Sequence, residues 1–371
     1  MSISTLRRRS ATLAAAMLSA ALMLTGCGSS DNTSTPSESK SSASTPSESS
    51  SPTSTDGMPA AEGKTQYPLT LKSEWGETTL DERPLRIAAV TANALDVELL
   101  ASLGVVPVLA SARIDAGVWT VEALPTLPDA TFEPVGGGSG NVTLPFEEIA
   151  AVKPDLILAL DIDDAKYDRL SQIAPVVAAG TAAQQDSDWR AYLDAIGEAV
   201  DLSSKADDVE SSYDTYFTEF AAEHPDFQGK TVTQLVYFGQ QSGLNYNTVT
   251  GGRVESFFLS LGFDPNPLGE QFVAASSVSL ENLSQVDADV IVLSAVVGGD
   301  PADITDNELW KGLTAVKNGA VVITKAKDAS SYEFDGKSYD GNLAWAMGTA
   351  GPLGRQWAAE RLGSMIDSVL K

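Results

Sequence analysis

From about residue 66 onward, short apolar runs alternate with segments that repeat apolar residues at helical spacing. The runs at 86–90, 156–160 and 289–294 have the composition of buried strands. Between the first two runs, leucines recur on one face of a predicted helix over residues 93–103. Strands that alternate with helices pair in parallel, with the helices packed on the faces of the sheet. The pattern therefore predicts an α/β fold.

The longest uninterrupted helical pattern spans residues 203–224. Tyr213 and Phe217 lie on one face of it, and acidic residues lie between them. The strand–helix alternation stops at this segment and restarts after it. We therefore predict two Rossmann-like α/β lobes joined by one long helix. The predicted N-terminal lobe covers residues 66–202, and the predicted C-terminal lobe covers residues 225–371.

The N-terminus has the features of an export signal. Three arginines at residues 7–9 precede an apolar stretch at 11–24, which is too short to anchor stably across a bilayer. Leu24-Thr25-Gly26-Cys27 follows and resembles a bacterial lipobox, whose cysteine carries lipid and becomes the new N-terminus. We predict a lipoprotein signal peptide at residues 1–26 and lipidation of Cys27. The alternative is an ordinary signal peptide with an incidental cysteine, and the arginines leave Sec and Tat export both open.

Residues 27–65 are rich in serine, threonine and proline and contain few large apolar side chains. The six-residue sequence at 34–39 recurs at 44–49. Such a segment cannot bury enough apolar surface to offset the entropy lost on ordering. We predict a flexible tether between the lipid and the folded protein.

Composition excludes several classes of function. The chain of 371 residues has 24 Lys and Arg against 50 Asp and Glu, a net charge of −26, which argues against nucleic-acid binding. Removal of residues 1–26 brings the charge to −29, so covalent lipid rather than charge would hold the protein at a membrane. The single cysteine and the single histidine, His224, argue against disulfides, metal clusters and a histidine base. We predict no catalytic residues and no metal site, so the protein is not an enzyme, and a surface hydrolase is the weakest alternative.

Five segments of the chain resemble, in the same order, sequences of one family of receptors. They are residues 83–87, 99–108, 144–157, 279–291 and 313–322. The family comprises periplasmic-binding-protein-like lipoproteins that bind iron–siderophores or vitamin B12 for ABC importers. The resemblance implies two lobes joined by a rigid helix, a ligand cleft between the lobes, and a monomer at the extracytoplasmic face of the bacterial membrane. It also implies an ABC permease as partner and a ferric siderophore as ligand.

Glu147 and Glu281 occupy matching places in the two lobes, each at the start of a predicted helix. A carboxylate in the first turn of a helix is favoured by the helix dipole, and this effect alone explains both residues. The family resemblance implies a further role, in which one exposed glutamate per lobe docks onto arginines of the permease. We predict this docking role for both, with Glu148 as an alternative to Glu147.

The ligand should lie against the loops that follow the carboxyl ends of the strands. Arg113 and Arg253 fall in such predicted loops, one in each lobe. A guanidinium group suits the anionic oxygens of catecholate or carboxylate siderophores. The alternative for both arginines is an internal salt bridge.

Several aromatic residues lie in or near the same loops, and we predict that they line the cleft. Aromatic walls suit a large ring-containing ligand, although aromatic residues of α/β proteins also occupy the core. The residues are Trp119, Tyr237, Tyr246, Tyr332 and Trp345.

Haem or cobalamin capture by the same fold is the second hypothesis. Haem needs an axial side chain from the protein, and one of Tyr237, Tyr246 and Tyr332 would have to supply it. Cobalamin needs no such ligand. Between Asp328 and Asn342 we predict a polar loop that borders the cleft.

Overall fold

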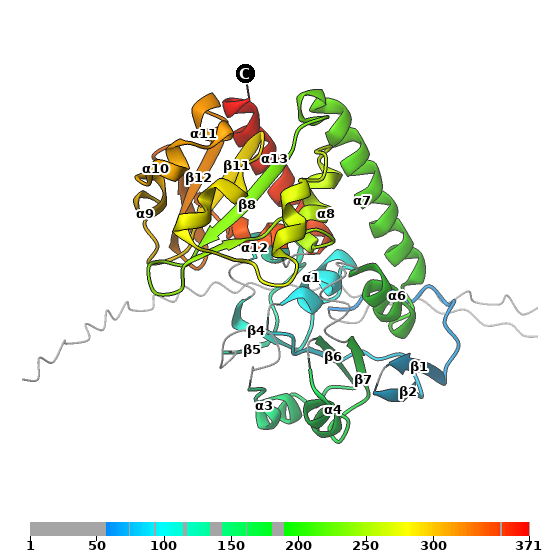
Figure 1. Cartoon of the computed structure of the whole chain (residues 1–371). Helices are drawn as coiled ribbons and strands as arrows, with labels where there is room; N and C mark the ends of the chain where they lie inside the picture. Colours follow the sequence, from blue (N-terminus) through cyan, green and yellow to red (C-terminus); the bar gives the residue numbers. More distant parts are fainter. Residues whose placement is uncertain are drawn as a thin grey trace, which may run out of the picture. The chain divides into compact units, whose positions relative to one another are not determined.

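The computed structural model describes residues 57–73, 75–92, 94–113, 117–133, 143–160, 162–179, 189–348 and 351–370. These residues form two α/β lobes, each built around its own sheet (Figure 1). No helix among them is long and apolar enough to cross a membrane. The predicted signal peptide, Cys27 and most of the predicted tether lie outside the described residues.

The first lobe contains an antiparallel hairpin and a parallel sheet. In the hairpin, β1 (Leu69–Ser73) pairs with β2 (Gly76–Leu80). The five strands of the sheet lie in the order β5-β4-β3-β6-β7, and all neighbours are parallel. They are β3 (Ile87–Ala89), β4 (Leu109–Ser111), β5 (Ala130–Phe132), β6 (Leu156–Leu160) and β7 (Val176–Ala179).

Helices connect these strands and cover the sheet. Every residue of β6 is buried, which agrees with a central strand that is covered on both faces. The side chain of Asp163 accepts a hydrogen bond from the backbone N–H of Lys166 at 2.8 Å and so caps α4. The helices are α1 (Leu95–Ser102), α2 (Val118–Ala123), α3 (Phe146–Ala151), α4 (Asp164–Leu170) and α6 (Trp189–Ala199).

The helix α7 (Ser203–Glu223) is the longest of the described helices and agrees with the prediction to one residue. It runs along one side of both lobes in Figure 1 and packs against α6, α8 (Arg253–Ser260) and α13 (Pro352–Val369). Its buried face carries Tyr213 and Phe217, the residues from which the helix is predicted. A single continuous helix bends little, so only modest movement of the lobes is expected.

The folded part of the chain begins earlier than the sequence predicts. Residues 57–65, predicted as part of the tether, pack on the first lobe. Met58 is buried, and one oxygen of the Asp201 carboxylate accepts the backbone N–H groups of Lys64 and Thr65 at 2.8 Å each. The carboxylate of Glu62 in turn accepts N–H groups from the first turn of α7. This segment is held by polar contacts with residues far along the chain, which hydrophobic periodicity does not detect.

The second lobe contains a mixed sheet of seven strands in the order β10-β9-β8-β11-β12-β13-β14. Its three central strands, β8, β11 and β12, are parallel. Residues 328–342, predicted as a polar loop, instead contain the whole antiparallel pair β13–β14, so that prediction is wrong. The strands are β8 (Val232–Tyr237), β9 (Leu244–Tyr246), β10 (Ser277–Val278), β11 (Val290–Ala295), β12 (Val321–Asp328), β13 (Ser331–Phe334) and β14 (Lys337–Asp340).

The C-terminal helix α13 links the two halves of the structure. It packs against β12 and α12 of the second lobe, and also against α1 and α2 of the first. The remaining helices of the second lobe are short. They are α9 (Ala302–Thr305), α10 (Glu308–Lys311), α11 (Thr314–Asn318) and α12 (Leu343–Gly348), with 3₁₀ turns η2 (Pro225–Phe227), η3 (Pro267–Phe272) and η4 (Leu280–Val286).

Candidate ligand-binding site

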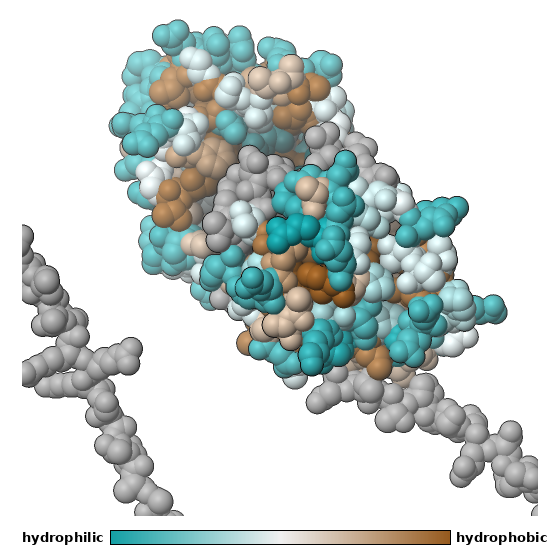
Figure 2. All heavy atoms as spheres, turned by 90° about the horizontal axis from the view of Figure 1, so that it is seen from below, coloured by the Kyte–Doolittle hydropathy of each residue, from teal (hydrophilic) through white to brown (hydrophobic). Residues whose placement is uncertain are grey.

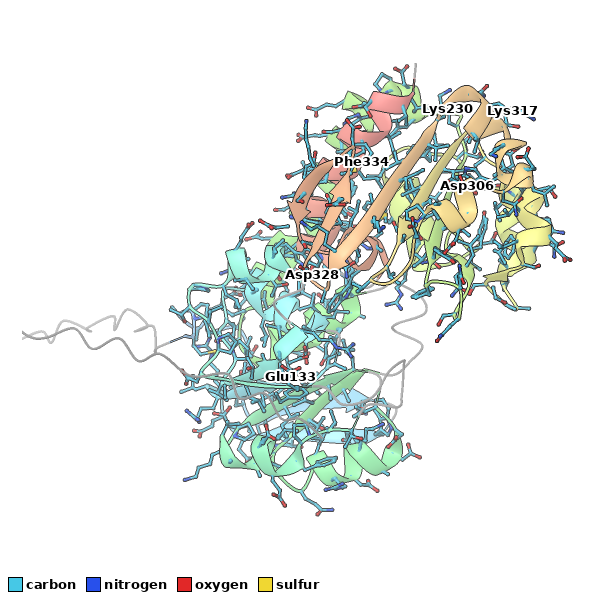
Figure 3. The ribbon with its side chains drawn as sticks, turned by 90° about the vertical axis from the view of Figure 1, so that its left-hand side faces the viewer. Glu133, Lys230, Asp306, Lys317, Asp328 and Phe334 are labelled. Carbon is cyan, nitrogen blue, oxygen red and sulfur yellow. The ribbon has the colours of Figure 1, made fainter. Side chains whose placement is uncertain are left out.

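The parallel strands of the second lobe point their carboxyl ends toward the first lobe. In Figure 3, Lys230 and Lys317, which precede β8 and β12, lie at the far end of the second lobe. Asp328, the last residue of β12, lies at the end that faces the first lobe. In open α/β sheets, ligands bind outside the carboxyl ends of the strands. The candidate site is therefore at this edge, as the sequence predicts.

At the carboxyl edge of the first lobe, short hydrogen bonds shape the turns after the strands. The Thr91 hydroxyl accepts the backbone N–H of Leu160 at 3.0 Å, and the Ser111 hydroxyl donates to the carbonyl of Ala92 at 3.1 Å. Arg113 follows β4 by two residues, and its side chain is exposed. Its position agrees with the prediction, and its role in binding an anion stays a prediction.

At the carboxyl edge of the second lobe, a small cavity of about 70 Å³ lies between the ends of β11 and β12 and the start of α12. Two hydroxyl groups in its lining are hydrogen-bonded, Thr324 to Ser294 at 3.1 Å. Tyr332 of β13 also belongs to the lining; its side chain is 3% exposed, and its hydroxyl has no hydrogen-bond partner in the structure. The cavity can hold a small polar group, whereas a whole ligand needs about 300 Å³ or more.

Burial keeps the hydroxyl of Tyr332 protonated. Desolvation raises the pKa of Tyr332 to about 12, more than the nearby Arg361 lowers it. At neutral pH the group is therefore a protonated hydroxyl. Leaving such a donor buried without a partner costs free energy.

Two exposed apolar side chains border the same edge. Phe238 directly follows β8 and is 43% exposed, and Val297 follows β11 by two residues and is 57% exposed. Large apolar side chains exposed next to a cavity often mark a binding surface. Sequence reasoning did not single out either residue. Their place directly after predicted buried strands was the signal that could have identified them.

Glu147 and Glu281 are both exposed and lie in the first turns of α3 and η4. The Ser279 hydroxyl accepts the backbone N–H of Glu281 at 3.4 Å and so begins η4. Figure 2 looks onto the end of the first lobe that carries α3 and α4, where hydrophilic residues surround smaller apolar patches. Exposure at a helix start agrees with both explanations of these glutamates, so the docking role stays a prediction.

Comparison with known proteins identifies the family. A family model described as periplasmic binding protein matches residues 90–327, more than half of the chain. The chain belongs to the periplasmic binding protein family. The family resemblance and the two-lobed α/β fold predicted from the sequence are thus confirmed.

Several relatives of known identity cover most of the chain. The Fe(3+)-citrate-binding protein YfmC of Bacillus subtilis is 25% identical over 309 residues, which are 82% of this chain and 86% of the relative. The ferric-anguibactin-binding protein FatB of Vibrio anguillarum is 26% identical over 70% of this chain and 81% of its own length. The crystal structure of Streptococcus pneumoniae PiaA in complex with ferrichrome is 25% identical, with a TM-score of 0.63 over 81% of this chain and 98% of that one.

Four of the five aromatic residues predicted to line the cleft are buried in the core, namely Trp119, Tyr237, Tyr246 and Tyr332. Trp119 belongs to α2 and is 6% exposed, and its indole N–H donates to Glu98 at 3.0 Å. Tyr246 ends β9 and is 0% exposed, with its ring stacked on Phe272 at a centroid distance of 4.2 Å. Their predicted place in cleft loops is wrong, because each belongs to a regular element that turns its ring into the core.

The other predicted residues lie nearer to the carboxyl edge. Tyr237 is the last residue of β8, and its buried hydroxyl donates to Asp303 at 2.8 Å. Burial, with the Asp303 carboxylate, raises the pKa of Tyr237 to about 12. Arg253 begins α8, and its carbonyl accepts a hydrogen bond from Arg355 at 3.1 Å. Trp345 lies half-buried in α12.

Part of the predicted cleft lies outside the described residues. Two further loops that the sequence predicts at the cleft are residues 136–141 and 113–119; the first, and residues 114–116 of the second, lie outside the described residues. Within the described residues, no group of three or more His, Cys, Asp or Glu side chains is arranged to hold a metal ion.

Proposed function

We propose that this chain is the substrate-binding lipoprotein of an ABC importer and that it captures a ferric siderophore in the cleft between its lobes. In this role the protein binds and releases the ligand, and no covalent step is involved. The observation that carries the proposal is the carboxyl edge of the second lobe. There a small cavity, lined in part by Ser294, Thr324 and Tyr332, lies close to exposed apolar residues.

The chemistry of the two edges suits such a ligand. Arg113 offers a guanidinium group to anionic oxygens, and Tyr332 offers a hydroxyl donor. Phe238 and Val297 offer apolar surface to the organic frame of a siderophore. Family membership and relatives named for ferric citrate, ferric anguibactin and ferrichrome support the same ligand class.

Delivery needs an anchor and a contact with the permease. Lipid on Cys27 would hold the protein at the outer face of the cell membrane, and the serine-rich tether would give it reach. Glu147 and Glu281, both exposed, would each contact an arginine of the permease. The protein would act as a monomer.

Haem is the less favoured alternative. Of the three tyrosines that could serve as an axial ligand, Tyr237 is hydrogen-bonded to Asp303 and Tyr246 is fully buried in the core. Tyr332 retains a free hydroxyl, but burial raises its pKa to about 12, which disfavours the tyrosinate that iron binds. Cobalamin stays open as an outcome of the binding test.

The test is a tryptophan-fluorescence titration of the chain from Cys27 onward. The panel contains ferric citrate, a ferric catecholate, a ferric hydroxamate, haem and cobalamin. Saturable binding of one ferric siderophore would support the proposal and name its chemistry. Binding of haem or cobalamin alone would replace the ligand class, and no binding to any of the five would contradict a receptor role.

A further inference from the structure

One buried carboxylate connects the two lobes directly. Glu98 lies on α1 of the first lobe and is 2% exposed. One of its oxygens accepts the backbone N–H of Gly354 on α13 at 2.9 Å, and the other accepts the indole N–H of Trp119 at 3.0 Å. The ring of Trp119 in turn lies 5.0 Å from that of Trp357 on α13. Glu98 therefore joins α1 and α2 of one lobe to the first turn of α13.

The Glu98 carboxylate supplies the N-terminal capping acceptor that α13 lacks. The first backbone N–H groups of a helix have no partner within the helix, and a negative charge there is favourable. Gly351, which precedes α13, makes no side-chain capping bond. The carboxylate that takes this place comes from a residue 256 positions earlier in the chain. Glu98 is thus the N-terminal cap of a helix that belongs mainly to the other lobe.

The hydrogen-bond partners of Glu98 favour its ionised form, whereas its burial disfavours that form. Its hydrogen-bond partners are all donors, so both oxygens are needed as acceptors. Burial raises the pKa of Glu98, and the N–H groups of Gly354, Gly351 and the Trp119 ring act against this rise. A bond from an N–H group to a buried carboxylate is stronger than a bond between neutral groups.

The position of Gly351 shows how closely the two lobes approach. A Cβ atom at this residue would lie 3.0 Å from one Glu98 oxygen and 3.0 Å from the side chain of Leu95. Real Cβ contacts are rarely so short, so a larger residue would push α1 and α13 apart. The glycine permits the close contact that the carboxylate needs.

We propose that Glu98 is a positioning residue that holds the two lobes at a fixed angle and so sets the width of the cleft. The long helix α7 is the first connection between the lobes. The packing of α13 on α1 and α2, in which the Glu98 carboxylate supplies the polar contact, is a second one at another place. Two connections restrict rotations that either one alone would allow. This inference rests on the two-lobed structure and holds whichever ligand the cleft binds.

The test measures the distance between the lobes in the full-length chain by pulsed electron spin resonance. One spin label is placed on each lobe through Asp168→Cys on α4 and Lys317→Cys on α11, both exposed positions, after Cys27→Ser removes the natural cysteine. Glu98→Gln keeps the size of the side chain but replaces one acceptor oxygen with an N–H₂ group. That group cannot accept the N–H of Gly354 or of the Trp119 ring. We expect a broader distribution of inter-label distances, shifted away from that of the parent protein.

Asp96→Asn is the matched control. Asp96 is an equally buried acid on the same helix, but its carboxylate accepts the N–H groups of Thr91 and Val97, both within the first lobe and both at 2.8 Å. We expect this variant to keep the parent distance distribution. If Glu98→Gln lowers the melting temperature but leaves the distribution unchanged, the residue is only structural and the proposal is wrong.

A second variant covers the case in which Glu98→Gln does not fold. Trp119→Phe keeps an aromatic ring against Trp357 but removes the N–H that orients the Glu98 carboxylate. A broadened distribution in this folded variant would support the proposal. A distribution identical to that of the parent protein would overturn it.

Discussion

Both lobes are built around parallel strands, but different kinds of side chain lie at the carboxyl ends of those strands. In each, parallel strands point their carboxyl ends to the candidate site. The first lobe presents an exposed cation there, Arg113, two residues after the end of the short strand β4. The second lobe presents the apolar side chains of Phe238 and Val297 and the buried hydroxyl of Tyr332, and it extends its sheet with the β13–β14 hairpin.

This difference indicates a division of the binding energy. Charge from the first lobe would act on the anionic groups of a ligand, and it would weaken as salt rises. Apolar contact and a neutral hydrogen bond from the second lobe would act on charged and neutral ligands alike. Variants in the two lobes should therefore differ in the kind of ligand they affect, as well as in the size of the effect.

The largest effect is expected outside the cleft. Charge reversal by Glu147→Lys and Glu281→Lys should abolish iron uptake by cells, because each lysine would repel an arginine of the permease. Ligand affinity, measured by fluorescence titration, should stay at the parent value, because both glutamates are exposed at helix starts. A loss of affinity in either variant would contradict the docking role, and a loss of uptake in only one would show that the lobes dock unequally.

The next effect concerns Asp96, on the first helix of the first lobe. Burial, only partly offset by hydrogen bonds from Thr91 and Val97, raises the pKa of Asp96 to about 7 from its usual 3.8. Between pH 4 and pH 7 the folded protein therefore binds more protons than the unfolded chain. The contribution of Asp96 to the free energy of unfolding is fully present below about pH 4 and is lost as the pH rises to about 7. The loss amounts to about 1 kcal/mol per pH unit.

Asp96→Asn should remove this dependence. Urea unfolding at pH 5 and pH 8 would compare the free energies of unfolding of parent and variant. The expected result is a smaller difference between the two pH values in the variant. An equal slope in both proteins would show that Asp96 does not titrate in this range.

Arg113→Ala should weaken the binding of anionic ferric siderophores about tenfold, the cost of one charge-assisted hydrogen bond. Neutral hydroxamate complexes should lose little. Arg253→Ala, in the second lobe, tests whether a cation there adds to the same effect. Titrations at low and high salt would measure both variants. Equal losses for anionic and neutral ligands would mean that these arginines are structural.

Phe238→Ala should weaken anionic and neutral ligands by the same factor, about fivefold, because it removes about 1 kcal/mol of apolar contact. Leu309→Ala is the control, since Leu309 is equally exposed but lies on α10, away from the strand ends. A loss confined to anionic ligands would remove the proposed difference between the lobes.

The smallest effect is expected for Tyr332→Phe. Its hydroxyl has no partner in the structure, so stability should change by less than about 1 kcal/mol. A fall in ligand affinity without a fall in melting temperature would identify the hydroxyl as a ligand contact. Unchanged affinity would leave the second lobe with apolar contacts only.

The local pattern of apolar and polar residues was sufficient to predict much of the architecture. The runs that became β3, β6 and β11, and the helix α7, were all predictable because strand and helix periodicity depends on neighbouring residues. The places of Glu147 and Glu281 at helix starts were predictable for the same reason. The candidate site at the carboxyl ends of the strands followed from the order of these elements.

Tertiary structure decided which polar and aromatic residues meet. Trp119 and Tyr246 are core residues because elements distant in sequence cover them, and residues 57–65 are ordered because Asp201 binds them. The contact between Glu98 and Gly354 joins positions 256 residues apart. Periodicity carries no information on such pairs, because they arise only when the packed lobes bring the chain together. By itself the sequence determined the lobes and the helix between them, and only packing decided how the lobes are held and which side chains face the cleft.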